Sequence, residues 1–231
     1  MGFLVPLLMC LFFLIVWFAL SRFLLTVYTV SVKRALLCSP SLDRTSTAAL
    51  LSVYFGAKSL FRDRWFPKRS FAGTVYEEIP CILLVGGKIF VLEICPYPGV
   101  IYNTGEAVWQ IDPPKEYQRK EIRVPNPVLL AKERAELLKE LLRVLKLPFE
   151  VSVESMAILT DKRHHLTYSS ESGLYELPEA ISYLSGYAAK SKPSQKKMKR
   201  ERAVVLAALE HYSLSRSRAM ARNDRIRRQK K

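Results

Sequence analysis

The chain has 231 residues, of which 49% are hydrophobic and 25% are charged. This length is sufficient for one domain of ordinary size with attached segments. The formal net charge is +15, but fifteen basic and three acidic residues lie between Lys190 and Lys231. The chain before this segment is therefore nearly neutral, which excludes a domain that is basic throughout.

The N-terminal segment is strongly apolar, and residues 3–20 carry no charged side chain. As a helix this run would be about 27 Å long, close to the hydrocarbon thickness of a bilayer. A cleaved signal peptide is the alternative, but no Lys or Arg precedes the run and apolar residues continue beyond Arg22. Lys33 and Arg34 follow, so the positive-inside rule predicts a retained single-pass anchor over residues 1–33, with the rest of the chain in the cytoplasm.

Residues 34–47 read as a linker, because the run from Cys38 to Thr47 is polar and contains Pro40. Thr45, Ser46 or Thr47 can supply the N-cap of a helix over residues 48–60. Arg62-Asp63-Arg64 with Pro67 is expected to end this helix. Residues 71–78 predict a first short strand that continues beyond Pro80, where the missing N–H indicates a bulge or an edge.

A β-hairpin is predicted over residues 81–95, where two apolar runs flank Gly86 and Gly87. The two glycines supply the positive φ of a tight turn, and runs this apolar are typical of strands buried on both faces. Glu93 is the anomaly in the second strand. A buried carboxylate needs a paired charge, a metal ion or a position at the rim.

The following elements alternate between short strands and helices. Asn126 and Pro127 are the N-cap and first residue of a helix with a strong apolar face. The other expected elements are strands at 100–102 and 107–111, a charged surface loop at 115–125, a buried strand at 151–160, a turn at 161–165 and a last helix at 177–188. His164 and His165 lie in that turn, and because strand neighbours point to opposite faces, they cannot chelate one metal together.

The segment from residue 45 to residue 187 resembles the nuclease-related domain, a branch of the PD-(D/E)XK nuclease superfamily. The resemblance rests on an apolar strand that carries a Glu before a turn to Gly, a following Trp, and an Asn-Pro helix start: Lys88–Ile94, Cys95–Gly99, Trp109-Gln110 and Asn126-Pro127-Val128. It implies an α/β (α+β) fold with a restriction-endonuclease-like αβββαβ core at residues 48–188. One transmembrane helix precedes this core and a basic helical tail at 189–231 follows it.

The resemblance also implies a metal site that this sequence alters. Such nucleases hold Mg²⁺ with an Asp and a Glu, and a Lys stabilises charge on the phosphate. Here the position of the Asp falls on Pro80 or Cys81, and that of the Lys falls on Cys95. Glu93 is the remaining motif acid and the one expected metal ligand. We therefore predict a degenerate site with no cofactor, which favours a protein that is not an enzyme over the alternative below, in which Mg²⁺ is the cofactor.

A migrated active site is the alternative interpretation. Glu77 and Glu78 lie just before the first hairpin strand, and Lys88 begins the second. Glu78 as a migrated acid and Lys88 as a migrated lysine would give an active Mg²⁺-dependent endonuclease. In the simpler interpretation, Glu77 and Glu78 are solvated charges at a strand edge.

The four cysteines lack a Cys-x-x-Cys spacing. Cys81 and Cys95 can face each other across the hairpin, but a reducing cytoplasm disfavours a disulfide. Buried thiols that fill space are therefore expected.

The tail is expected to contact anions. A basic start leads into an apolar helical run at 203–209, and further arginines follow almost without acids. Contact with nucleic-acid phosphates, attraction to anionic lipid and a solvated end are the three interpretations. The predicted contact residues are Lys196, Lys197, Lys199, Arg200, Arg202, Arg225, Arg227 and Arg228.

Together these features predict a membrane-anchored nuclease-related domain that is catalytically degenerate and binds nucleic acid, lipid or a protein. The membrane is one expected partner, and no small-molecule substrate is evident. An active metal-dependent endonuclease with a migrated site is the alternative function.

Overall fold

The computed structural model describes residues 4–70, 73–102, 105–117, 120–167, 172–190 and 195–228. The chain forms two compact units, Met1–Ser39 and Pro40–Lys231. Each unit is described by itself below.

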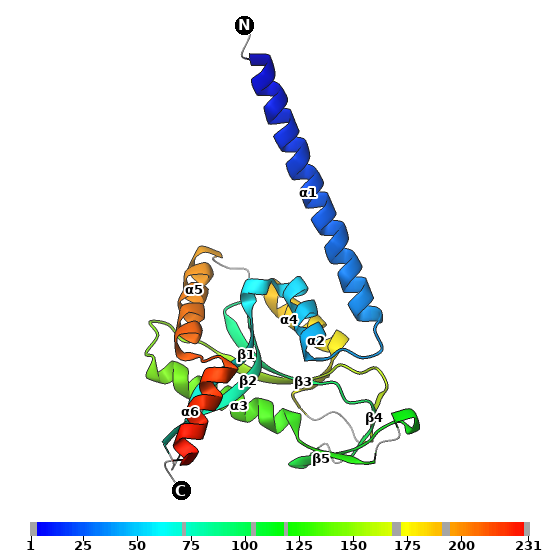
Figure 1. The fold of residues 1–231 in the computed structure, drawn as a ribbon, viewed down its shortest axis with the longest axis vertical. Helices are drawn as coiled ribbons and strands as arrows, with labels where there is room; N and C mark the ends of the chain where they lie inside the picture. The colour runs from blue at the N-terminus through cyan, green and yellow to red at the C-terminus, as the bar shows by residue number, and fades with distance from the viewer. Residues whose placement is uncertain are drawn as a thin grey trace. The chain divides into compact units, whose positions relative to one another are not determined.

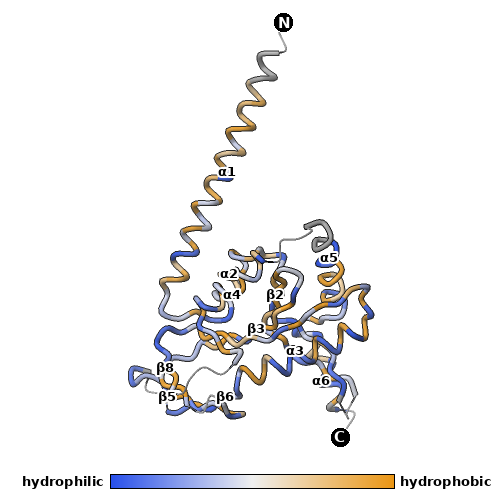
Figure 2. Tube along the Cα trace, turned by 180° about the vertical axis from the view of Figure 1, so that it is seen from behind, coloured by the Kyte–Doolittle hydropathy of each residue, from blue (hydrophilic) through white to orange (hydrophobic). Residues whose placement is uncertain are grey.

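The first unit consists of one long helix, α1 (Leu4–Cys38), whose side chains are mostly apolar along its length (Figure 2). From Met9 onward it is long and apolar enough to cross a membrane. A signal sequence at an N-terminus shares these two properties. The helix runs through residues 34–38, which the sequence assigned to the linker.

The second unit contains a five-stranded sheet in the order β1-β2-β3-β7-β9 (Figure 1). β1, β2 and β3 are antiparallel neighbours, whereas β3, β7 and β9 run parallel. The bounds of these strands are Leu60–Ser70, Gly73–Val85, Lys88–Cys95, Val153–Leu159 and Leu174–Glu176. The predicted hairpin is therefore the β2–β3 pair, with Gly86 and Gly87 in the turn at φ 57° and 82°.

Helices cover both faces of this sheet. Successive residues of β3 point to opposite faces of the sheet, so each of them packs against one set of helices or the other. Ile89 and Val91 belong to a core cluster with residues of α3 (Pro127–Val144). Phe90 instead makes edge-on ring contacts with Tyr183 and Tyr187 of α4 (Leu177–Lys190). The near-continuous apolar sequence of β3 follows from this burial on two sides.

A smaller sheet in the order β6-β5-β4-β8 shares a core cluster with residues of β3, β7, β9 and α3. Its strands are β4 (Gly99–Tyr102), β5 (Val108–Asp112), β6 (Ile122–Pro125) and β8 (His164–Leu166). Trp109 is fully buried in this core. Residues expected as a surface loop therefore include strand β6 and a short 3₁₀ turn, η2 (Lys115–Tyr117).

The region between the anchor and the hairpin differs from its predicted structure. Helix α2 spans Arg44–Phe55, and its N-cap is Asp43, whose Oδ1 accepts a hydrogen bond from the Ser46 N–H at 2.7 Å. The helix ends at Gly56, where φ is 89°, and a 3₁₀ turn, η1 (Ala57–Ser59), leads into β1. The prediction that Arg62-Asp63-Arg64 ends a helix was wrong, because this run lies in a strand that pairs with β2.

The basic C-terminal segment forms two helices that pack on the β1–β2 hairpin. Val205 and Leu209 of α5 (Gln195–Tyr212) are buried in the core cluster of the large sheet. Leu214 exchanges two backbone hydrogen bonds with Trp65 at the edge of β1. In α6 (Arg216–Arg228) the Asn223 side chain bonds the backbone N–H and C=O of Tyr76 in β2 at 2.8 and 2.9 Å. These contacts make the segment part of the folded unit.

The α5 contact gives a stability prediction with an internal control. Leu209→Ala should lower the free energy of unfolding by about 2–5 kcal/mol, because it leaves a cavity at a fully buried site. Val204→Ala, in the same helix but 41% exposed, should change it far less. Urea unfolding of the unit Pro40–Lys231 measures both. Equal, small effects would mean that α5 does not support the core.

Candidate functional site

Glu93 lies where strand β3 leaves its partner β2. The β2–β3 ladder ends at the pair Cys81 and Leu92, whereas Glu93 and the following residues pair with β7. Despite this position the carboxylate is almost completely buried, with 6% of its side chain exposed. Glu93 is thus a buried charge at a fork in the sheet.

Pro80 lies at the fork and accounts for a gap in the β1–β2 ladder. Extension of the β2–β3 register by one residue places Pro80 opposite Glu93. On the other side of β2, the β1 ladder pairs Arg62 with Cys81 and Arg64 with Ile79, and the residue between, Asp63, has a φ of 51°. Proline has no N–H for a ladder. The register also identifies Pro80, rather than Cys81, as the residue beside Glu93.

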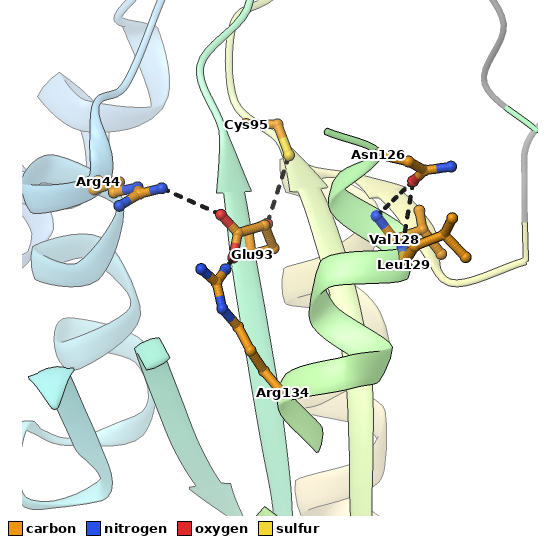
Figure 3. Close-up of polar contacts among 7 residues, drawn as sticks. All are labelled: Arg44, Glu93, Cys95, Asn126, Val128, Leu129 and Arg134. Atoms are coloured by element: carbon orange, nitrogen blue, oxygen red, sulfur yellow. Dashed lines mark hydrogen bonds and ion pairs between the residues drawn. The ribbon is translucent and has the colours of Figure 1, made fainter. Parts of the chain in front are cut away.

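Two arginines from different helices hold the Glu93 carboxylate (Figure 3). The Arg44 guanidinium of α2 lies 3.2 Å from Oε1, and Arg134 of α3 forms an ion pair with Oε2. Arg134 is itself mostly buried, with 14% of its side chain exposed, whereas 48% of the Arg44 side chain is exposed. We call Arg44, Glu93 and Arg134 the arginine clamp.

Backbone pairing and helix caps place the two arginines of the clamp. The Leu42 N–H donates a hydrogen bond to the Thr160 carbonyl oxygen just beyond β7 at 3.2 Å, and the Thr160 hydroxyl donates one to the Leu42 carbonyl oxygen at 2.6 Å. This pairing and the Asp43 cap fix the first turn of α2, where Arg44 lies. Asn126 caps α3 by accepting hydrogen bonds from the N–H groups of Val128 and Leu129, as the sequence predicted.

In the clamp, one carboxylate lies between two guanidinium groups. Burial raises the pKa of the Glu93 carboxyl above its ordinary value, and the guanidinium groups of Arg134 and Arg44 counteract this rise. Two full positive charges face one negative charge, so the site carries an excess of positive charge. An incoming Mg²⁺ would meet both guanidinium groups at close range.

The residues suggested for a migrated active site make contacts with other residues than Glu93. Lys88, at the opposite end of β3, pairs with Glu154 and faces the Tyr187 ring at 4.7 Å. The five-residue separation places it on the other face of the strand from Glu93. Glu77 pairs with Lys68 at 2.6 Å. Glu78 is close enough to raise the pKa of Glu93, but no ion pair joins it to the clamp among the described residues.

Both hairpin cysteines are buried free thiols. Burial raises the pKa of Cys81 to about 12 and that of Cys95 further, so both are neutral at physiological pH. The Cys95 thiol donates a hydrogen bond to the carbonyl oxygen of Glu93 at 3.8 Å (Figure 3). Cys81 pairs with Leu92, which is three residues before Cys95, so Cys81 and Cys95 point to opposite faces of the sheet. The suggestion from the sequence that they face each other across the hairpin was therefore wrong.

The histidines and the predicted basic contact residues lie elsewhere. His164 Nε2 lies 3.4 Å from Glu176. No group of three or more metal-ligating side chains occurs in the described ranges. Arg200, Arg225 and Arg228 are exposed, and Arg202 bonds the Ser59 hydroxyl. The side chains of Lys196, Lys197, Lys199 and Arg227 lie outside the described residues.

Sequence reasoning missed Arg44 and Arg134, the two partners of Glu93. Each lies more than forty residues away from it along the chain. The sequence did contain one signal for Arg134. This arginine lies within the apolar face of the predicted helix after Asn126, just as Glu93 lies within an apolar strand. A buried acid and a buried base are each expected to need the other.

Loss of Arg134 should strongly destabilise the fold. Arg134→Met leaves Glu93 buried with one exposed partner, and breaking such a buried pair typically costs about 3–5 kcal/mol. Lys132→Met, an exposed neighbour on α3, and Arg44→Ala, whose side chain is half exposed, should each cost about 1 kcal/mol or less. Urea unfolding of Pro40–Lys231 at neutral pH measures all three.

The same variant should respond to pH in a defined direction. Without Arg134 the pKa of Glu93 rises further, so the folded state gains stability as Glu93 takes up a proton. This stability is complete below the ordinary Glu pKa of about 4.3 and is lost as the pH rises. The deficit of Arg134→Met should therefore shrink on acidification, and a pH-independent deficit would contradict the ion pair.

Comparison with known proteins identifies the family of this domain. The sequence model of the nuclease-related domain matches residues 50–160. No curated protein and no solved structure matches the chain. The match begins within α2 and ends just after β7, so it contains the hairpin, Glu93 and α3. Residues 50–160 of this chain therefore belong to the nuclease-related domain family.

Proposed function

We propose that this chain is a membrane-anchored nuclease-related domain that does not cleave nucleic acid and instead binds phosphate-rich partners. The arginine clamp is the observation that carries the proposal. Both oxygens of Glu93 are paired with guanidinium groups, and these are the oxygens that a metal ion would need.

The neighbours of Glu93 support the same conclusion. A hard cation such as Mg²⁺ requires oxygen ligands, but Pro80 lies beside Glu93 in the register and has no side-chain oxygen. Cys95 carries a neutral thiol in place of an ammonium group. Each lost group typically costs a few kcal/mol of transition-state stabilisation. The carboxylate instead joins α2 and α3 across β3.

The unit Pro40–Lys231 should therefore show no Mg²⁺- or Mn²⁺-dependent cleavage of DNA or RNA. With two catalytic groups lost, activity should be lower than that of an intact site by about four or more orders of magnitude. Gel assays with single- and double-stranded DNA and RNA measure it. Metal-dependent cleavage that disappears in Glu93→Gln would show that the site is active, and that an acid or lysine outside the clamp completes it.

The basic helix α6 supplies a candidate surface for phosphate. Ala219 is fully buried, and Asn223 holds the helix against Tyr76. Beside this buried face, the exposed Arg218, Arg222 and Arg225 follow one another at helical spacing. Arg222 donates a hydrogen bond to the Tyr76 hydroxyl at 2.6 Å, so the middle arginine of the row is held in place. Fixed arginines lose less conformational entropy on binding than a loose tail does.

Removal of two arginines should weaken binding to phosphate polyanions in a salt-dependent way. Arg218→Gln with Arg225→Gln should reduce the slope of log affinity against log salt by about two for duplex DNA, because two fewer counterions are released. Fluorescence anisotropy with DNA and RNA, and sedimentation with anionic vesicles, distinguish the two kinds of partner. Point substitutions are preferable to deletion, since α5 belongs to the core.

A matched control removes the same charge elsewhere. Lys115 and Arg123 are exposed near the smaller sheet, so Lys115→Gln with Arg123→Gln changes the net charge equally. This control should leave the salt slope unchanged. If both double variants weaken binding equally, the effect belongs to net charge and not to the α6 surface.

The anchor is the second part of the proposal. Apolar residues continue along α1 beyond Arg22, and the Arg22 guanidinium lies over the Phe18 ring at 5.2 Å. Such an arrangement suits a membrane interface. With Lys33 and Arg34 following the apolar run, the positive-inside rule favours a cytoplasmic location for Pro40–Lys231.

Protease protection should therefore leave the C-terminal unit accessible in inverted membrane vesicles and protected in right-side-out vesicles. The N-terminal peptide of the isolated protein should begin at Met1 or Gly2. A mature protein that begins near Ser21 would show that the segment is a cleaved signal sequence and would refute the anchor.

A further inference from the structure

A cavity of about 550 Å³ lies at the C-terminal end of α3. Its walls come from one stretch of chain, in which the last turns of α3 lead through a loop into the first residue of β7. The volume lies within the range of about 300–1,000 Å³ that small-molecule sites occupy. The lining residues are Lys139, Leu142, Arg143, Lys146, Leu147, Phe149, Glu150, Val151, Ser152 and Val153.

One wall of the cavity is apolar. Leu142 and Val153 are buried members of the large core cluster. Leu147, Phe149 and Val151 pack against that cluster but keep part of their surface exposed. The cavity therefore presents a continuous apolar surface, backed by the core, to whatever enters it.

The remaining lining residues are mostly cationic. Lys139, Arg143 and Lys146 carry three positive charges, and Glu150 is the one acid among the lining residues that the structure describes. Lys139 pairs with Glu136 at 2.6 Å. No ion pair joins Arg143 or Lys146 to another described residue. Two cations beside the apolar wall are therefore available to an anion.

The backbone at Lys146 is a second, independent observation. Its φ of 46° lies in the left-handed region, just after α3 ends. Glycine usually occupies this position, because a side chain there is strained by about 1–2 kcal/mol. The helix dipole favours a cation such as Arg143 in the last turn, but it gives no reason for a lysine in place of glycine at the mouth of a cavity.

We propose that this cavity binds a single-chain anionic amphiphile. The acyl chain would lie along Leu147, Phe149 and Val151, and a carboxylate or phosphate head group would contact Arg143 and Lys146. A nucleotide fits less well, since Ser152 is the one neutral polar side chain that lines the cavity in the described part of the chain. The inference uses neither the arginine clamp nor the α6 surface, so it is independent of the proposed function.

Photocrosslinking in the full chain tests the proposal. The protein is placed in nanodiscs of zwitterionic lipid and irradiated with an octanoic acid that carries a diazirine, and labelled peptides are mapped by mass spectrometry. Labelling should concentrate on residues 142–153, compete with octanoate and octyl phosphate, and be at least tenfold weaker for the methyl ester of the probe. The relative strength of the two competitors distinguishes a carboxylate from a phosphate head group.

Two variants separate binding from folding. Lys146→Gly removes a cation and also relieves the left-handed strain, so it should stabilise the fold while labelling falls about tenfold. Arg143→Gln should lower labelling by a similar factor, and Lys132→Gln on an exposed part of α3 should not change it. Equal labelling by the methyl ester, or unchanged labelling in both Lys146→Gly and Arg143→Gln, would overturn the proposal.

Discussion

Burial of the Glu93 carboxylate is the constraint on which the surrounding structure depends. Removing a carboxylate from water costs several kcal/mol unless opposite charges lie within contact distance. Arg44 and Arg134 supply these charges from helices on two different parts of the chain. Arg134 is mostly buried and Arg44 is half exposed, so the contact with α3 matters more than the contact with α2. The pairing of Leu42 with Thr160 fixes the position of α2.

The charges of the clamp are arranged in the opposite way to those of a Mg²⁺ site. A Mg²⁺ site places anionic oxygens around a cation, whereas here guanidinium groups surround an anion. Pro80 offers no carboxylate beside Glu93, and its missing N–H falls at the gap in the β1–β2 ladder. The neutral Cys95 thiol adds no charge.

The C-terminal helices show how composition can mislead. A segment with a charge of +12 reads as a solvated tail, because its many basic residues obscure a few apolar ones. Val205 and Leu209 nevertheless complete the core, and Asn223 satisfies backbone groups at the edge of β2. The arginines on the outer face are thereby held on a rigid support. A basic surface and a structural role occur together in one helix pair.

The sequence by itself determined the elements with strong local signals. Two glycines predicted the hairpin turn, Asn126 with Pro127 predicted the start of α3, and apolar runs predicted the buried strands. The acid in the apolar strand also predicted a need for a partner at Glu93. Only the tertiary structure decided which partner it has, because Arg44 and Arg134 are distant in sequence and no local pattern encodes their approach. Strand β1 was missed for the same reason: its charged residues look like a helix end, and only pairing with β2 makes them a strand.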